Sequence, residues 1–186
     1  MVKLHLGCGK RYLSGWTHVD IDGYDHIDAR SSIDDLTAFS DATVSQIYCS
    51  HALQYLDRLQ ARLALKEWYR VLVPDGWLHV AVPDFSALIT IFARSSNLDA
   101  ILGPLFGRMA IGESQDHIYH KTVWDEQSLR SLLATSGFKN IDTYDPIAFL
   151  QNQSGVEFDD HSLAFYPHMD RNGIQVSICL TAQAAK

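Results

Sequence analysis

Residues 3–22, KLHLGCGKRYLSGWTHVDID, contain the pattern on which the predicted fold depends. A strand-like run at residues 3–6 ends in Gly7-Cys8-Gly9, and a second run at residues 17–21 carries Asp20 near its end. Glycines directly after a strand let the backbone turn tightly and approach a ligand closely. The link from Gly7 to Thr17 barely reaches the roughly dozen residues that a parallel crossover usually needs. We therefore expect two parallel strands whose crossover helix is shortened or missing.

The rest of the chain alternates short strand-like runs with helical patterns, which is typical of a parallel sheet covered by helices. Apolar residues at i, i+3 and i+7 (Leu65, Trp68 and Leu72) predict a helix over residues 56–72. A second helix is expected from residue 125 or 126 to residue 136. Further strands are expected at residues 45–49, 77–82, 140–144 and 174–181, with a weaker edge strand at 26–29.

The 186 residues fit one domain with a single core, and residues 1–186 are predicted to form it. Residues 85–109 read as helical and follow a strand directly, so residues 85–120 are expected to form a lid-like insertion over the site. Pro74-Asp75-Gly76 is a turn signal between the first long helix and the next strand. The polar segment 151–171 has no assigned structure.

The net charge of −7 argues against nucleic acid as a partner, because nucleic-acid binding needs a clustered basic face. Seven aspartates lie between residues 20 and 41, opposed there only by Arg30. This cluster fits a solvated acidic surface, and it equally fits a site that prefers a cationic, hydroxyl-rich ligand over a phosphate.

Three cysteines without CxxC spacing indicate reduced thiols in a cytoplasmic protein. No signal peptide is recognised, and the longest apolar stretch is too short to span a membrane. We expect a cytoplasmic protein without a membrane partner.

The carboxyl ends of the expected strands should meet at one edge of the sheet, where α/β proteins bind ligands. Glycines, carboxylates and a hydroxyl at those ends suit a nucleoside. A dinucleotide site needs GxGxxG and an acidic residue about 20 positions further on. Here Tyr12 stands at the third glycine position, and Asp20 follows Gly9 by only eleven residues. The pattern favours S-adenosylmethionine (SAM) over NAD.

The sequence also resembles a known family. KLHLGCGKR followed by GWTHVDID is similar to the first two motifs of class I SAM-dependent methyltransferases. IDDLTAFSDATVSQIYCSHALQYL resembles the adenine-contacting loop and fourth strand of their type 11 group. KEWYRVLVPDGWLHVAVPDF and DEQSLRSLLATSGF resemble the helix–turn–strand and the penultimate helix that follow. The match covers roughly residues 3–85 and 124–140.

The resemblance implies a Rossmann-like, doubly wound, mostly parallel sheet with an antiparallel C-terminal strand. It implies SAM as the cofactor, and we expect a small molecule or sugar as the methyl acceptor. It also implies where SAM lies: along Gly7, Cys8 and Gly9 with its methionine and ribose, on Asp20 with its ribose hydroxyls, and above Ser50 and His51 with its sulfonium. The full set of implied cofactor-binding residues is Gly7, Cys8, Gly9, Asp20, Ile21, Asp35, Leu36, Ser50 and His51.

One pair of this set has a competitor, and the surrounding motifs depart from the family pattern at two places. Asp35 and Leu36 match the adenine-contacting pair, while a competing alignment uses Asp28 and Ala29. The usual acidic residue two positions before the first glycine is His5, and a usual Glu-His pair is replaced by Gln54-Tyr55.

The acceptor site is sought in the segment DHIYHK and at a strand end, giving Asp84, His117, Tyr119 and His120. A histidine of near-neutral pKa there is a candidate base, although these residues fit core or capping roles as well. Asp116, His117 and His120 do not have the spacing of a metal site. No catalytic residue is assigned.

Three functions are compatible with these observations. The first is an active SAM-dependent methyltransferase; the second is a SAM-binding, degenerate relative that serves as a regulatory or interaction module. The third is a nicotinamide-dependent enzyme.

Overall fold

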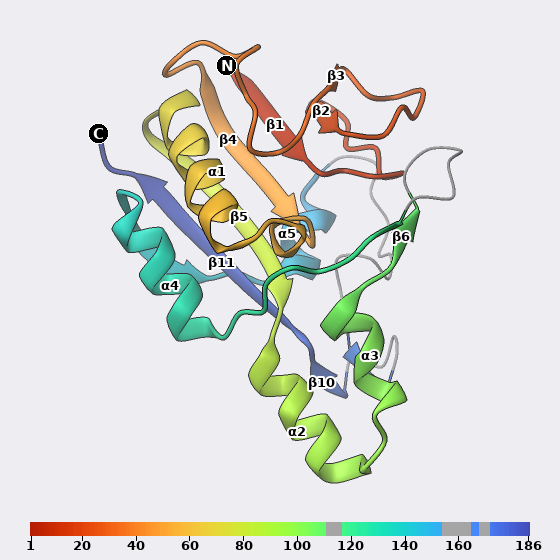
Figure 1. The fold of residues 1–186 in the computed structure, drawn as a ribbon. Coiled ribbons are helices and arrows are strands. Elements are labelled where there is room, and N and C mark those ends of the chain that lie inside the picture. Colours follow the sequence, from red (N-terminus) through yellow and green to blue (C-terminus); the bar gives the residue numbers. More distant parts are fainter. Residues whose placement is uncertain (111–116, 154–164, 168–171) are drawn as a thin grey trace.

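The protein is built around a seven-stranded sheet, seen in a computed structural model that describes residues 1–110, 117–153, 165–167 and 172–186. The strand order is β3-β2-β1-β4-β5-β11-β8 (Figure 1). Neighbouring strands are parallel except at β11, which runs antiparallel to both β5 and β8. The strands are β1 (Val2–Leu6), β2 (Thr17–Asp20), β3 (Ala29–Arg30), β4 (Val44–Ser50), β5 (Leu72–Pro83), β8 (Phe138–Thr143) and β11 (Ser177–Ala184). This order and the single antiparallel strand confirm the predicted fold class.

One face of the sheet is covered by α1 (Arg58–Val71) and α4 (Glu126–Thr135). Asp57 begins α1 with a capping box, because its carboxylate accepts from the backbone N–H of Gln60 while the Gln60 side chain accepts from the Asp57 N–H. The apolar stripe of α1 then packs on the sheet, and the indole of Trp68 donates to the carbonyl of Ile33 at 2.7 Å. This contact holds the loop after β3 against the helix.

The opposite face lacks a first crossover helix. Residues 7–16 form turns instead of a helix, and they bury Leu13 and Trp16 against Tyr48 of β4. The short helix α5 (Pro146–Gln151) completes this face from behind the sheet in Figure 1. The expectation of a shortened first crossover is therefore confirmed, and the loop and α5 together replace the missing helix.

The insertion after β5 forms a second, smaller apolar cluster. It contains α2 (Phe85–Ser95) and α3 (Asp99–Phe106), which extend past the carboxyl end of β5 (Figure 1). Leu88 and Ile91 of α2 pack with Ile101 of α3 and with Val176. The remaining elements are η1 (Leu53–Tyr55), β6 (Met109–Ala110), β7 (His117–Ile118), β9 (Phe165–Tyr166) and β10 (Ile174–Gln175). Residues 111–116 of the insertion, and most of the unassigned segment 151–171, lie outside the described residues.

Two local expectations differ from the structure. The turn signal Pro74-Asp75-Gly76 lies inside β5, where it forms a bulge: between two pairings, β4 advances from Val44 to Gln46 while β5 advances from Leu72 to Trp77. Asp75 adopts a φ of 59° in this bulge, a conformation typical of turns, but the strand continues beyond it. The expected strand 174–181 is divided, because β10 pairs with β9 and only β11 joins the main sheet.

The described part of the chain contains no helix long and apolar enough to cross a membrane.

Candidate functional site

Gly7 lies where three chain segments meet at the carboxyl edge. Its N–H donates to the carbonyl of Val19 at 2.8 Å, and its φ of 61° is in the left-handed region. A Cβ at this position would lie 2.4 Å from the Cβ of Ala52 and 3.5 Å from Cγ2 of Ile33. The residue after β1 therefore packs against the loop after β3 and the loop after β4, and the absence of a side chain is required.

Asp20 is held rigidly at the end of β2. Its side chain is 5% exposed, one oxygen accepts from the N–H of Gly9 at 2.8 Å, and the other accepts from the N–H of Asp22 at 2.9 Å. Each carboxylate oxygen has a second lone pair, so the group can still accept from a ligand. The space that a Cβ on Gly9 would enter has no atom within 4 Å. Gly7, Gly9 and Asp20 thus form a corner that fits a diol beside exposed backbone.

Cys8 lies within the same corner, but its thiol is unreactive. Burial, followed by the negative charge of Asp20, raises the pKa of the Cys8 thiol to about 12. A neutral thiol is a poor nucleophile, so Cys8 contributes backbone and shape rather than covalent chemistry.

Ser50 and His51 follow at the end of β4, and His51 connects two sides of the edge. Its φ of 54° is unusual for a residue with a side chain. Its Nδ1 lies 3.2 Å from the hydroxyl of Ser50, and its Nε2 lies 2.8 Å from the hydroxyl of Ser177, the first residue of β11. The imidazole therefore reaches from β4 past the end of β5 to the neighbouring strand.

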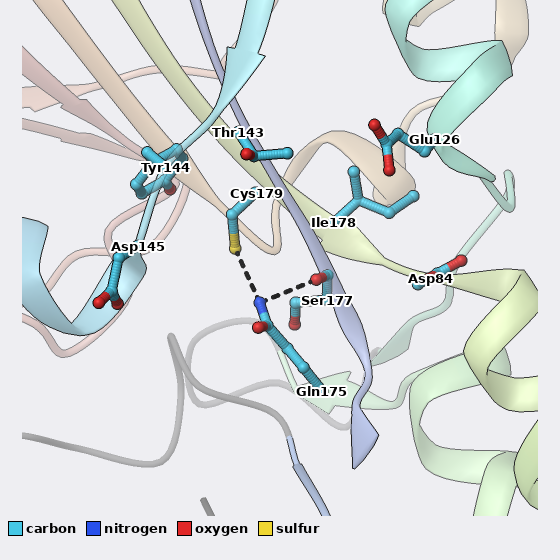
Figure 2. A pocket seen from close by; sticks show the side chains of 9 residues that line it. All are labelled: Asp84, Glu126, Thr143, Tyr144, Asp145, Gln175, Ser177, Ile178 and Cys179. Carbon is cyan, nitrogen blue, oxygen red and sulfur yellow. Dashed lines mark hydrogen bonds between the residues drawn. The ribbon is translucent and has the colours of Figure 1, made fainter.

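Ser177 lines an open cavity of about 380 Å³ at the carboxyl ends of β5 and β8 (Figure 2). Asp84 and Asp145 each use one oxygen to cap a helix: Asp84 accepts from the N–H of Ser86, and Asp145 accepts from the N–H of Ile147. Glu126 pairs with Arg130 at 2.7 Å. The lining residues are Asp84, Glu126, Thr143, Tyr144, Asp145, Gln175, Ser177, Ile178 and Cys179.

The sequence-predicted adenine contacts, Asp35 and Leu36, lie in the loop after β3. Asp35 is exposed and accepts from the N–H and hydroxyl of Thr37, whereas Leu36 is buried in the core and its carbonyl accepts from Arg70 in the last turn of α1. Ile33 is the loop residue that lies nearest to Gly7. The competing Asp28 accepts from the backbone N–H and the ring of His18. The adenine contacts stay a prediction, and so does the cofactor contact of Ile21.

Of the predicted acceptor residues, only Asp84 lines the cavity. His120 contacts η1 and α3 instead: its ring lies 4.8 Å from that of Tyr55, and its Nδ1 lies 3.1 Å from the carbonyl of Pro104. Burial lowers the pKa of His120. His117 lies in β7, and Tyr119 is half exposed. Asp116 lies outside the described residues.

Sequence reasoning missed the residues that β8 and β11 contribute to the cavity. Ser177 lies beside Pro83 only because β11 runs antiparallel to β5, which pairs Ser177 with Pro83. A single sequence contains no register signal between strands so far apart. The one indication in the sequence analysis is the expected antiparallel C-terminal strand, because such a strand begins at the carboxyl edge of the sheet.

Comparison with known proteins agrees with this fold. Residues 4–80 match the family model described as a methyltransferase domain. A SAM-dependent methyltransferase structure from Methanosarcina mazei is 15% identical, with 98% of this chain and 92% of that chain covered and a TM-score of 0.57. The 1,6-didemethyltoxoflavin-N1-methyltransferase of Burkholderia thailandensis, solved with 1,6-didemethyltoxoflavin and S-adenosylhomocysteine, is 15% identical, with 100% and 71% covered and a TM-score of 0.59. A search of curated proteins found no match.

Proposed function

We propose that this chain is a SAM-dependent methyltransferase that methylates a small molecule at the carboxyl edge of its sheet; the methyltransferase-domain match of residues 4–80 and the class I fold support this proposal. The observation that supports the proposed site is the corner of Gly7, Gly9 and Asp20. Its buried carboxylate suits ribose hydroxyls, and its glycine backbone suits the close approach of the methionine portion.

When bound, SAM supplies an electrophilic methyl group. The chain's own residues would hold and orient it: Gly7, Cys8 and Gly9 by backbone contact, and Asp20 by its carboxylate, with Ile21 beside it. Ser50 and His51 would lie below the sulfonium, and Asp35 and Leu36 stay the proposed adenine contacts. Methyl transfer depends largely on such positioning, which contributes on the order of 7–11 kcal/mol in well-oriented reactions.

The size of the cavity supports a small acceptor. About 380 Å³ is within the usual range for small-molecule sites. The related Burkholderia thailandensis structure holds 1,6-didemethyltoxoflavin, which is also a small molecule. A sugar acceptor is compatible with the same volume, and His117, Tyr119 and His120 remain proposed acceptor contacts from the insertion.

We also propose that residues 85–120 act as a lid. The segment begins directly after Asp84, and the chain that follows it returns across the edge, where the N–H of Lys121 donates to the carbonyl of Gln54. We expect S-adenosylhomocysteine and an acceptor together to slow hydrogen exchange in α2 and α3. Unchanged exchange in both helices would make the insertion a structural element only.

Asp20→Asn tests the cofactor site. The variant keeps one oxygen for one of the two backbone contacts, sets its amide group against the other N–H and loses the charge that strengthens bonds to hydroxyls. We therefore expect the Kd for S-adenosylhomocysteine to rise ten-fold or more by calorimetry. Asp75→Asn is the matched control, because Asp75 lies in the exposed bulge of β5 and asparagine tolerates its positive φ. Equal affinity of a folded Asp20→Asn protein would contradict the site. NAD is titrated in parallel, and tighter binding of NAD would contradict the function.

A further inference from the structure

We infer that the cavity between β5, β8 and β11 binds a small-molecule amine as the methyl acceptor, and that His51 takes the proton that this amine must lose. The inference rests on the proposed methyl transfer and names the acceptor class and the base for it. It is drawn from the contact between His51 and Ser177 and from the chemistry of the cavity wall.

The cavity lies at the same edge of the sheet as the cofactor corner. β1, β2 and β4 end at the corner, while β5 and β8 end at the cavity, and all five strands run in the same direction. Because β4 and β5 are neighbours, the residue after β4 lies between the two sites. His51 is that residue.

His51 is fixed in a position that faces both sites. Its backbone is anchored by a hydrogen bond from its N–H to the carbonyl of Ala81 at 2.8 Å, and its left-handed φ sets the direction of the side chain. Unusual backbone conformations of this kind are concentrated at functional positions. The contact of Nε2 with the hydroxyl of Ser177 brings the imidazole to the cavity wall. A ligand that replaces the Ser177 hydroxyl would meet a ring nitrogen able to accept a proton.

The charge of the cavity wall selects the acceptor. Among the residues that the structure describes, three carboxylates line it, and no lysine or arginine does. Arg130 balances Glu126, which leaves Asp84 and Asp145. Each of these uses Oδ1 as a helix cap, and the described residues provide no hydrogen-bond donor to either Oδ2. Because Asp84 and Asp145 line opposite sides of the cavity (Figure 2), an ammonium group would meet a carboxylate oxygen on whichever side it binds, whereas a carboxylate or phosphate acceptor would meet only like charge.

The proposed step balances without a further reactant. The bound ammonium gives one proton to Nε2 of His51, and the freed amine lone pair then forms a bond to the methyl carbon. The carbon–sulfur bond breaks, and its electron pair stays on sulfur. The products are the N-methylated ammonium, S-adenosylhomocysteine and a protonated His51, which releases its proton to solvent.

Binding of matched probes tests the acceptor class. We would titrate protein saturated with S-adenosylhomocysteine with 2-phenylethylamine, 2-phenylethanol and 3-phenylpropionate, and with hexylamine, 1-hexanol and heptanoate. At least one amine should bind ten-fold more tightly than its alcohol and carboxylate partners. The double variant Asp84→Asn/Asp145→Asn should remove that preference, because asparagine still caps a helix but has no charge. Asp57→Asn, a cap of α1 outside the cavity, is the control and should keep it.

The outcomes separate the inference from the function on which it rests. If S-adenosylhomocysteine binds but no amine binds, or the alcohols or carboxylates bind as tightly, the cavity assignment is wrong and the cofactor site stands. If S-adenosylhomocysteine does not bind, the proposed function itself fails.

His51→Asn tests the base with the amine that binds best. We expect kcat for its methylation to fall about 100-fold, with the Kd for the amine changed less than three-fold. The rise of kcat with pH in the parent should also disappear. Ser45→Ala, at the amino-terminal end of β4, controls for effects of mutation and purification, and its kcat should equal that of the parent. Equal kcat and an unchanged pH profile in His51→Asn would overturn the role of His51.

Discussion

Gly7 belongs both to the packing of the fold and to the proposed cofactor site. In Gly7→Ala the new Cβ would lie 2.4 Å from the Cβ of Ala52, and its φ of 61° would disfavour any side chain. We expect the variant to lose about 2 kcal/mol or more of unfolding free energy and to bind S-adenosylhomocysteine more weakly, because the loop after β4 must move. Urea denaturation and calorimetry measure the two effects.

Gly15→Ala is the matched control for this prediction. Gly15 has a φ of 80°, but a Cβ there would meet no atom within 4 Å. It should lose stability through backbone conformation alone and should keep its affinity. Equal losses in the two variants would show that the contact with Ala52 does not matter.

Single residues are predictable where a local sequence pattern defines their position. They are not predictable where their position depends on the pairing of strands that are distant in sequence. The glycines and Asp20 could be identified because a strand end, a turn and a carboxylate lie within twenty residues of sequence. Ser177 could not, since its place beside His51 depends on pairing between β5 and β11. The histidines of DHIYHK were chosen for their residue type, yet the structure brings His120 to Tyr55 and Pro104 rather than to the cavity.

At the scale of elements, α1 provides a direct test of local sequence signals. The carboxylate of Asp57 accepts from the N–H groups of Leu59 and Gln60 at 2.8 and 2.9 Å. Asp57→Ala should therefore lower the unfolding free energy by about 1 kcal/mol and the Tm by roughly 2–4 °C. Asp57→Asn should stay close to the parent in thermal unfolding. A loss in Asp57→Asn as large as in Asp57→Ala would assign the effect to charge rather than to capping.

Helices and strands are predicted well where the apolar periodicity agrees with the capping and turn residues at their ends. The apolar stripe of α1 and the missing first crossover both follow from short-range sequence features. Pro74-Asp75-Gly76 predicts a turn because these residue types suit a tight turn and a β-bulge equally well. Only the pairing of β5 with β4 shows that the strand continues. The separate strand β10 depends on β9, a partner that sequence alone does not indicate.

At the scale of the whole molecule, a row of polar rings crosses the face that lacks the first helix. His18, His5, Tyr48 and His79 are register partners on β2, β1, β4 and β5. The rings of His5 and Tyr48 lie 5.1 Å apart, and Phe149 of α5 covers the row 4.5 Å from His79. Within the described residues, Nδ1 of His5 and Nδ1 of His79 have no hydrogen-bond partner. The loop and α5 thus cover His5 and His79, whose buried rings must stay neutral.

This row should make the folded protein sensitive to acid. Burial lowers the pKa of His79 from 6.5 to about 4 and holds the pKa of His5 well below its usual value, with nearby Arg11 as a smaller cause. A histidine whose pKa is lower when folded stabilises the protein above pH 6.5, and this contribution is lost as the pH falls toward the folded pKa, because the unfolded chain binds the proton more readily. For His79 the loss between pH 6.5 and 4 is on the order of 3 kcal/mol.

His79→Phe keeps an aromatic ring against Phe149 and Tyr144 but cannot bind a proton. In urea denaturation at pH 7.5, 6 and 5, the parent should lose stability more steeply than His79→Phe, and parallel pH dependence in the two proteins would show that His79 is not the group that titrates.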